Sequence, residues 1–400
     1  MKQLFRLFLC LTANVFILGC NNQTAKNYME PINPNITKEA RNLYHFIQDV
    51  QGKYTLSAMH NFCGKGSEYS DRLKALTGKE AVIWGSDFSF CVQGDDAMSF
   101  QHCGPANLPA IDLDGNRQRR DTARRNRNMQ PVFLDITLEQ ARDSTIREIK
   151  KQHAAGHIIT MMWHGCFPTD GDCCDGSSIW AMENRPSPAE WDSLVTGGTA
   201  LNDAWKQGAD KIARYLKQLQ DANIPVLWRP YHEMNGVWFW WCDQPGDQGF
   251  KRLWIMMYNY FTNVHKLNNL IWVWDTNAPR DTPGDEAYAY DLFYPGDNYV
   301  DILAADVYHN DFKQSHHDQL ASLGKGKPIA LGEVGNIPTT EILDQQPEWT
   351  WYMPWAWILF MYNDPGQIKA LMNSNRVLTM DEIEVRKNGK YTIKKPKKDS

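Results

Sequence analysis

Eight short runs rich in β-branched and aromatic residues alternate with longer amphipathic stretches along this chain. Such an alternation of strand and helix is typical of a (β/α)8 barrel, in which each strand is followed by a helix that covers it. Apolar residues recur at helical spacing most clearly over Leu138–His153, Asp203–Ala222 and Phe250–Leu267. We therefore predict an α/β fold with one (β/α)8 (TIM) barrel. The predicted strands are Tyr54–His60, Ala81–Phe88, His157–His164, Pro225–Glu233, Leu270–Thr276, Asp301–Tyr308, Pro328–Val334 and Thr350–Trp357.

The composition agrees with one large soluble domain. The chain has 400 residues, 42% of them hydrophobic, and shows no internal repeat or second compositional regime. Its net charge of -5 leaves no basic surplus that would hold a phosphate backbone. We therefore expect no nucleic-acid partner, and we expect a monomer.

Residues 1–19 have the features of an export signal. Lys2 and Arg6 precede an apolar run, Leu7–Leu18, that is too short to span a bilayer of about 30 Å. The run ends in Ile17-Leu18-Gly19-Cys20, which resembles the bacterial lipobox. An ordinary signal peptide followed by a chance cysteine is the alternative interpretation.

We predict that cleavage leaves Cys20 at the N-terminus, where it carries a lipid. The stretch 20–37 is polar, contains Pro31 and Pro34 and lacks a hydrophobic period, which suits a spacer. The predicted catalytic domain is 38–400. These features place the protein in a bacterial cell envelope, lipid-anchored on the periplasmic side or on the outer-membrane surface.

Seven cysteines remain after the signal and the lipid site, so at least one thiol stays unpaired even where disulfides form. Cys166, Cys173 and Cys174 lie near His164 in the sequence, but two separated C-x2-C pairs are lacking. We therefore expect no zinc site. The seven are Cys63, Cys91, Cys103, Cys166, Cys173, Cys174 and Cys242.

Polar and ionisable residues gather at the C-terminal ends of the predicted strands. In a parallel barrel these ends form one rim, so residues far apart in sequence converge on one cleft. Unrelated surface polar groups would explain any one of them but not the recurrence. The residues are His60, Asp87, His164, His232 with Glu233, Asn277, Tyr308 and Glu333.

Two of these residues are carboxylates in different settings. Glu233 is followed by the aromatic block Val237–Trp241, which would raise its pKa and suit a general acid. Glu333 has small neighbours that let a substrate approach, and Arg229 and Tyr308 would keep its pKa ordinary, which suits a nucleophile. A separation near 5 Å would give retention, and a longer one inversion. Ordinary salt-bridged rim residues are the alternative.

The aromatic content is also high, with 16 Trp, 16 Tyr and 16 Phe. Large flat rings with a polar edge stack on sugars, although a big core also absorbs them. Composition leaves both interpretations open.

The strings WRPYHEMNGVWFWW, YPGDNYVDILAADVYHND and LGEVGN resemble those of glycoside hydrolase family 26, a retaining (β/α)8 family. The resemblance covers about Lys38 to Ile383. Its most specific sign is His-Glu, where most families of the large clan that contains family 26 have Asn-Glu. It implies that Glu233, at the end of the fourth strand, is the acid/base and that Glu333, at the end of the seventh, is the nucleophile.

The resemblance also implies the substrate-binding residues. Arg229 and His232 match positions that orient the carboxylates and sugar hydroxyls, and Tyr308 matches the tyrosine that donates to the nucleophile. Ala356 stands where mannanases often have Arg, and the run Cys166–Cys174 is unlike the usual loop. The remaining matches are His164, Trp238, Asp306 and Trp355, with Trp357 as an alternative to Trp355.

Mannan is the commonest substrate of the family, so the resemblance implies a retaining glycoside hydrolase that cleaves β-1,4-mannosidic bonds in mannan, glucomannan or galactomannan. We expect no metal or organic cofactor, because hydrolysis by a pair of carboxyl groups requires none. The same core supports two other enzymes, a β-1,3-1,4-glucanase and a β-xylanase. A non-catalytic glycan-binding lipoprotein is a third alternative, and loss of either carboxylate would favour it.

Overall fold

The computed structural model describes residues 27–89, 91–92, 100–101, 137–170, 179, 181, 185–386 and 389–394. The predicted signal peptide and Cys20 lie outside these ranges. None of the described helices is both long enough and apolar enough to cross a membrane.

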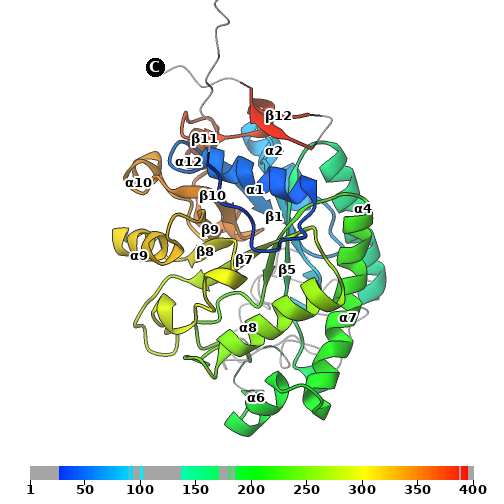
Figure 1. Cartoon of the computed structure of the whole chain (residues 1–400). Coiled ribbons are helices and arrows are strands. Elements are labelled where there is room, and N and C mark those ends of the chain that lie inside the picture. The colour runs from blue at the N-terminus through cyan, green and yellow to red at the C-terminus, as the bar shows by residue number, and fades with distance from the viewer. Residues whose placement is uncertain are drawn as a thin grey trace, which may run out of the picture.

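In the described part of the chain, eight parallel strands form a closed barrel (Figure 1). Neighbouring strands pair in chain order, and β10 pairs with β1 to close the ring, with Leu56 opposite Trp351. Each of the eight predicted runs overlaps one of these strands, with ends that differ by up to three residues, so the predicted (β/α)8 fold is confirmed. The strands are β1 (Thr55–His60), β2 (Ile83–Asp87), β5 (Ile158–Trp163), β6 (Val226–Pro230), β7 (Leu270–Asn277), β8 (Ile302–Val307), β9 (Ile329–Val334) and β10 (Trp349–Pro354).

Ten α-helices are described, and they surround the strands. In Figure 1, α4 and α7 lie on one side of the barrel and α9, α10 and α12 on the other. Hydroxyl caps begin several of them, as at Thr137 and Ser187, which each form a capping box. The helices are α1 (Lys38–Val50), α2 (Glu68–Thr77), α4 (Leu138–Ala154), α6 (Pro188–Val195), α7 (Ala200–Asp221), α8 (Phe250–Asn259), α9 (Gln314–Gly324), α10 (Thr340–Gln345), α11 (Ile358–Tyr362) and α12 (Pro365–Met372).

Side chains alternate between the inside and the outside of the barrel, as the pleat of a strand requires. On β7, Ile271 and Val273 belong to the interior cluster, whereas Trp272 points outward and lies 5.6 Å from Trp254 of α8 between ring centroids. The inward series of β7 continues to Asp275 and Asn277. The interior is therefore apolar below and becomes polar toward the C-terminal ends of the strands.

The N-terminal end of the barrel is closed by α1, which packs in the same cluster as the interior side chains. The segment before it, assigned to the spacer 20–37, is packed from Tyr28 onward. Tyr28 stacks on His45, and the Ile32 amide donates to Asp301 just before β8. The first helix does begin at Lys38, but the packed chain begins earlier.

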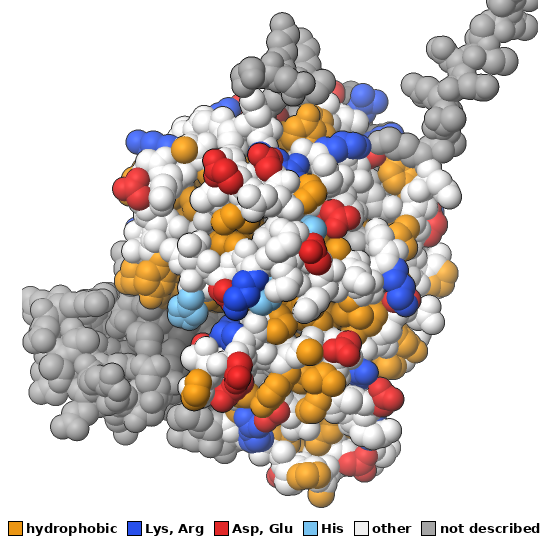
Figure 2. All heavy atoms as spheres, turned by 90° about the vertical axis from the view of Figure 1, so that its left-hand side faces the viewer, with side chains coloured by type: hydrophobic (Ala, Val, Ile, Leu, Met, Phe, Trp, Pro, Cys, Tyr) orange, Lys and Arg blue, Asp and Glu red, His pale blue; other side chains and the backbone are white. Residues whose placement is uncertain are grey.

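Short strands complete the fold. β11 (Val377–Leu378) pairs with the start of β1, β12 (Ile383–Val385) pairs with β13 (Tyr391–Ile393), and β3 (Cys91–Val92) pairs with β4 (Phe100–Gln101). On the described part of the face in Figure 2, basic side chains lie among acidic ones rather than in one continuous patch.

Candidate active site

The predicted rim residues do converge at the C-terminal ends of the strands. Register places Asn277 of β7 opposite Asp306 of β8, and Asp306 opposite Glu333 of β9. His232 and Glu233 follow β6 directly. Residues separated by about a hundred positions in the chain therefore lie around one buried polar centre.

Glu333 lies inside β9 and is 3% exposed. Arg229 Nη2 lies 2.9 Å from Glu333 Oε1, and the Tyr308 hydroxyl donates to Oε2 at 2.8 Å. Arg229 is fully buried, pairs through Nε with Asp275 Oδ2 at 3.0 Å and donates to the carbonyl of Gly332. One cation and one phenol thus hold both oxygens of Glu333.

Gly332 leaves space for Asp275, the carboxylate that pairs with Arg229. A Cβ on Gly332 would lie 2.0 Å from Asp275 Oδ1, which is much closer than real atoms approach. The small residue before Glu333 therefore makes room for the Asp275 carboxylate that balances the charge of Arg229.

Glu233 lies beyond the strand, not in it. The predicted run Pro225–Glu233 is too long, because β6 ends at Pro230 and the chain turns with positive φ at Tyr231 (47°) and Glu233 (54°). Such φ values are strained for residues with a side chain. The Glu233 amide donates to the Asp275 carbonyl at 2.8 Å, and Cys242 Sγ lies 3.0 Å from the Glu233 carbonyl oxygen, which stabilise this turn.

The side chain of Glu233 is bound by neutral donors. Asn277 Nδ2 donates to Oε1 at 2.5 Å, and Trp238 Nε1 donates to Oε2 at 2.7 Å. A hydroxyl oxygen still accepts such a bond, so these contacts suit a carboxyl group that gains and loses a proton.

His232 lies between the two glutamates. Its Nε2 is 3.9 Å from Glu233 Oε2 and 3.6 Å from Glu333 Oε1. These two oxygens are therefore no farther apart than the sum of the two distances. They face one space next to His232.

Burial dominates the protonation of this centre. Burial raises the pKa of Glu233 above the usual value for glutamate, although Asn277 and Arg280 act in the opposite direction. Burial also raises the pKa of Glu333, against the effect of Arg229, and the charge of Glu233 raises it further. The prediction that Glu333 keeps an ordinary pKa is therefore wrong, because Arg229 and Tyr308 do not offset its burial.

One proton is thus retained by the pair near neutral pH, and the contacts indicate where it lies. Glu333 accepts from a cation and a phenol, whereas Glu233 accepts from an amide and an indole. Hydrogen bonds from charged donors stabilise a carboxylate more than those from neutral donors. We therefore assign the charge to Glu333 and the proton to Glu233.

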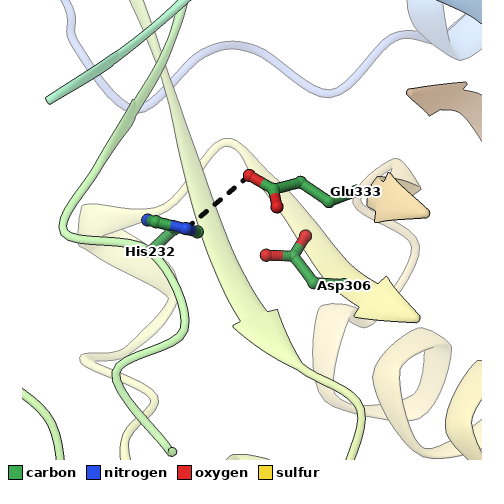
Figure 3. A group of neighbouring side chains, drawn as sticks. All are labelled: His232, Asp306 and Glu333. Carbon is green, nitrogen blue, oxygen red and sulfur yellow. Dashed lines mark ion pairs between the residues drawn. The ribbon is translucent and has the colours of Figure 1, made fainter. Parts of the chain in front are cut away.

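Ligating atoms of His232, Asp306 and Glu333 all lie within 4.8 Å of one another (Figure 3). Burial lowers the pKa of His232 well below its usual value, so its ring is neutral. Burial, together with the charge of Asp275, raises the pKa of Asp306 well above its usual value, and Asp306 hydrogen-bonds Asp275. Both oxygens of Glu333 already accept from Arg229 and Tyr308. These contacts suit a positioned carboxylate better than a cation site.

The predicted sugar-binding residues fall into two groups. Arg229 and Asp306 are fully buried behind the carboxylates, and Tyr308 reaches Glu333. In contrast, His164 and Trp355 border the space around His232. The rings of His164 and His232 lie 4.5 Å apart between centroids, and the ring of Trp355 lies 6.1 Å from that of His164.

Other contacts fix these border residues. His164 Nδ1 lies 2.7 Å from Asp87 Oδ2, and Trp355 stacks on His60 at 4.0 Å between ring centroids. Trp355 thus lies beside His164, whereas Trp357 is the N-cap residue of α11.

Most of the tryptophans pack the core. Trp240 and Trp241 are fully buried, and their indole nitrogens donate to the carbonyls of Gly165 and His232. The high tryptophan content is thus largely structural. Also almost fully buried are Trp84, Trp205, Trp228, Trp254, Trp272, Trp274, Trp349 and Trp351.

Sequence reasoning missed Asp275 and Arg280, which hold Arg229 and Asn277 respectively. The alternation of β7 offers a signal for Asp275, since it follows Ile271 and Val273 on the inward face. No comparable signal exists for Arg280, which lies in a loop.

The described cysteines include free and bonded ones. Cys63 and Cys242 are free and buried, and Cys166 is in a disulfide. The pairing in the Cys166–Cys174 run otherwise lies outside the described residues.

The family model for glycosyl hydrolase family 26 matches residues 134–382. A mannan endo-1,4-β-mannosidase of Thermothelomyces thermophilus is 28% identical, covering 88% of this chain and 63% of that protein. The chain thus spans less than two thirds of the length of the first curated relatives that it matches.

Two solved structures are also similar. GH26A from Muricauda sp. MAR_2010_75 is 39% identical with a TM-score of 0.73, covering 88% of this chain and 99% of that one. A β-mannanase from a symbiotic protist of the termite Reticulitermes speratus, in complex with gluco-manno-oligosaccharide, is 26% identical with a TM-score of 0.65, covering 89% and 98%.

Proposed function

Because this chain belongs to glycosyl hydrolase family 26, we propose that it is a retaining endo-β-mannanase that cleaves β-1,4-mannosidic bonds in mannan, glucomannan or galactomannan. The relatives named as mannan endo-1,4-β-mannosidases support this substrate class. The observation that carries the proposal is the pair Glu233 and Glu333, which face one space beside His232 with different donors.

In the proposed reaction, Glu333 attacks the anomeric carbon while protonated Glu233 gives its proton to the departing glycosidic oxygen. The C–O bond to the leaving sugar breaks as the bond to Glu333 forms. Glu233, now a carboxylate, takes a proton from water, whose oxygen displaces Glu333 from the anomeric carbon. Two inversions give net retention, and Glu233 regains its proton.

The surrounding residues have separate tasks in this proposal. Arg229 and Tyr308 hold Glu333 as a carboxylate, and Asp306 supports Arg229 through Asp275. His164, His232, Trp238 and Trp355 border the sugar. No step in this mechanism needs a metal or an organic cofactor.

The substrate class is tested by incubating the protein with mannan, glucomannan, galactomannan, barley β-glucan and xylan, followed by sizing of the products. We expect short manno-oligosaccharides from the three mannans, and β-anomeric products in early proton NMR spectra. Faster release from barley β-glucan or xylan would contradict the substrate, and initial α-anomers would contradict retention. Binding of all glycans without cleavage would indicate a glycan-binding lipoprotein.

We further propose that Cys20 carries the lipid anchor of a bacterial envelope protein. The segment from Tyr28 to Thr37 packs at the end of the barrel opposite the site, because Ile32 and Thr37 contact residues just before β8 and β7. An anchor at Cys20 would therefore leave the site facing away from the membrane. Cys20→Ala should convert a membrane-associated protein into an unprocessed or soluble one in fractionated cells. A wild-type protein found entirely in the soluble fraction would contradict the anchor.

A further inference from the structure

We propose that Arg280 is a positioning residue for the acid/base Glu233, acting through both side chains that donate to its carboxyl group. This inference rests on the proposed function. Arg280 lies in the loop after β7 and is partly buried.

Arg280 contacts both donors of Glu233. Its Nη1 donates to Asn277 Oδ1, and Asn277 Nδ2 donates to Glu233 Oε1 at 2.5 Å. Its guanidinium carbon lies 5.0 Å from the centre of the Trp238 ring, within the range of a cation–π contact, and Trp238 Nε1 donates to Glu233 Oε2. One side chain therefore supports the two hydrogen bonds that hold the acid.

The direction of the first contact matters chemically. A guanidinium only donates, so it requires the oxygen of the Asn277 amide and turns the NH2 group toward Glu233. The Trp238 indole donates to Oε2, so each oxygen of Glu233 accepts one N–H hydrogen bond and the carboxyl group is held in one orientation beside His232.

Arg280 is itself fixed. Asp285 accepts from Nη2 at 2.6 Å and from Nε at 2.9 Å, and the Asp285 carbonyl also accepts from Nε. The backbone amides of Arg280 and Ala287 exchange hydrogen bonds across the loop. This loop holds the guanidinium before any sugar binds.

The charge of Arg280 also acts on Glu233, lowering its pKa against the effect of burial. Other charged or titratable groups face Glu233 from the neighbouring elements, and they would be unchanged in an Arg280 variant. They are His232 and Cys242 around the turn, Asp275 of β7, Asp306 and Tyr308 at β8, and Glu333 of β9.

The test uses Arg280→Met and Arg280→Lys. Lysine keeps the charge but lacks the planar fork that reaches Asn277 and Asp285 together. We expect both variants to lower kcat/KM for mannohexaose by roughly 10- to 100-fold, because misplaced acids lose much of their effect. For 2,4-dinitrophenyl β-mannotrioside, whose leaving group needs little protonation, we expect a change of about threefold or less.

The two variants separate position from charge in the pH profile. Loss of the cation disfavours the Glu233 carboxylate, so the acid stays protonated to higher pH. The alkaline limb of kcat/KM should therefore move up by roughly half a unit to one unit in Arg280→Met and stay in place in Arg280→Lys. Arg252→Met, which removes an exposed pair with Asp192, is the matched control and should change neither quantity.

A titration that needs no substrate accompanies the kinetics. The carboxyl 13C signal of Glu233, assigned with Glu233→Gln, should titrate at higher pH in Arg280→Met than in the wild type. If this shift appears while the wild type cleaves no mannan, the inference stands and the proposed function fails. Equal losses on both substrates, or an unmoved Glu233 titration in Arg280→Met, would overturn the inference.

Discussion

The surroundings of Glu233 and Glu333 differ in backbone, donors and charge. Glu333 lies inside strand β9, next to a shift in its register with β8, and is bound by Arg229, a buried cation. Glu233 lies on a turn with positive φ and is bound by the neutral donors of Asn277 and Trp238. Similar burial thus gives two chemical behaviours, because the donors decide which carboxyl group keeps its charge.

The backbone around each glutamate also suits its proposed role. A nucleophile must stay at one position through two displacements, and a strand inside a barrel provides that. The acid/base exchanges a proton with two partners in turn. The strained turn at Glu233 places its side chain beside His232, and the hydrogen bond from its amide to the Asp275 carbonyl stabilises the turn.

The largest expected effect comes from truncating each carboxylate. Glu333→Ala removes the proposed nucleophile and should lower hydrolysis of mannan by roughly 10⁴- to 10⁶-fold. Azide can then occupy the gap and attack an activated aryl β-mannotrioside, giving a glycosyl azide of inverted configuration. In Glu233→Ala the nucleophile remains, so azide should release the glycosyl-enzyme with net retention.

The configuration of the azide products, read by proton NMR, checks this assignment. Products of the same configuration from both variants would refute the assigned roles. Glu190→Ala, at an exposed helix start, is a suitable control and should keep its activity on mannan.

Replacing Arg229 should remove much of the difference in charge between Glu333 and Glu233, because Arg229 is the cation that binds Glu333. Arg229→Met leaves Asp275 and Glu333 without their partner, and breaking a buried pair costs about 3–5 kcal/mol. We expect a lower free energy of unfolding in urea, and an activity loss of roughly 100-fold or more on mannan. Unchanged stability would show that the carboxylates are balanced in another way.

The fold and the two carboxylates were predictable because they depend on periodic patterns. Eight strand-like runs with polar ends are enough to place Glu233 and Glu333 on one rim. Pro230, which has no backbone N–H to donate, marks the end of β6 within the run Pro225–Glu233, but the positive φ of Glu233 in the turn that follows was not predictable.

The degree to which each side chain is buried was the main property that could not be predicted from the sequence. Arg229 and Tyr308 suggested an ordinary pKa for Glu333, but the depth of the site reverses that expectation. The tryptophans show the same limit, since Trp240 and Trp241 follow the acid/base in sequence and yet lie fully inside the core. Contacts from distant loops, such as Arg280 with Asn277, depend on loop geometry that has no sequence period.

The smallest expected effect comes from removing one hydrogen bond from each of the two carboxyl groups. Tyr308→Phe removes a donor that lowers the pKa of Glu333, and Trp238→Phe removes one that lowers the pKa of Glu233. Each loss should raise the affected pKa by about one to two units, since a hydrogen bond to a charged group contributes about 1.5–3 kcal/mol. Glu333 must be deprotonated to attack, so Tyr308→Phe should move the acid limb of the bell-shaped pH profile of kcat/KM to higher pH and narrow the profile.

Glu233 must be protonated to donate, so Trp238→Phe should move the alkaline limb of the same profile to higher pH and widen the profile. Movement of the same limb in both variants would contradict the separate roles, because each donor reaches only one carboxyl group.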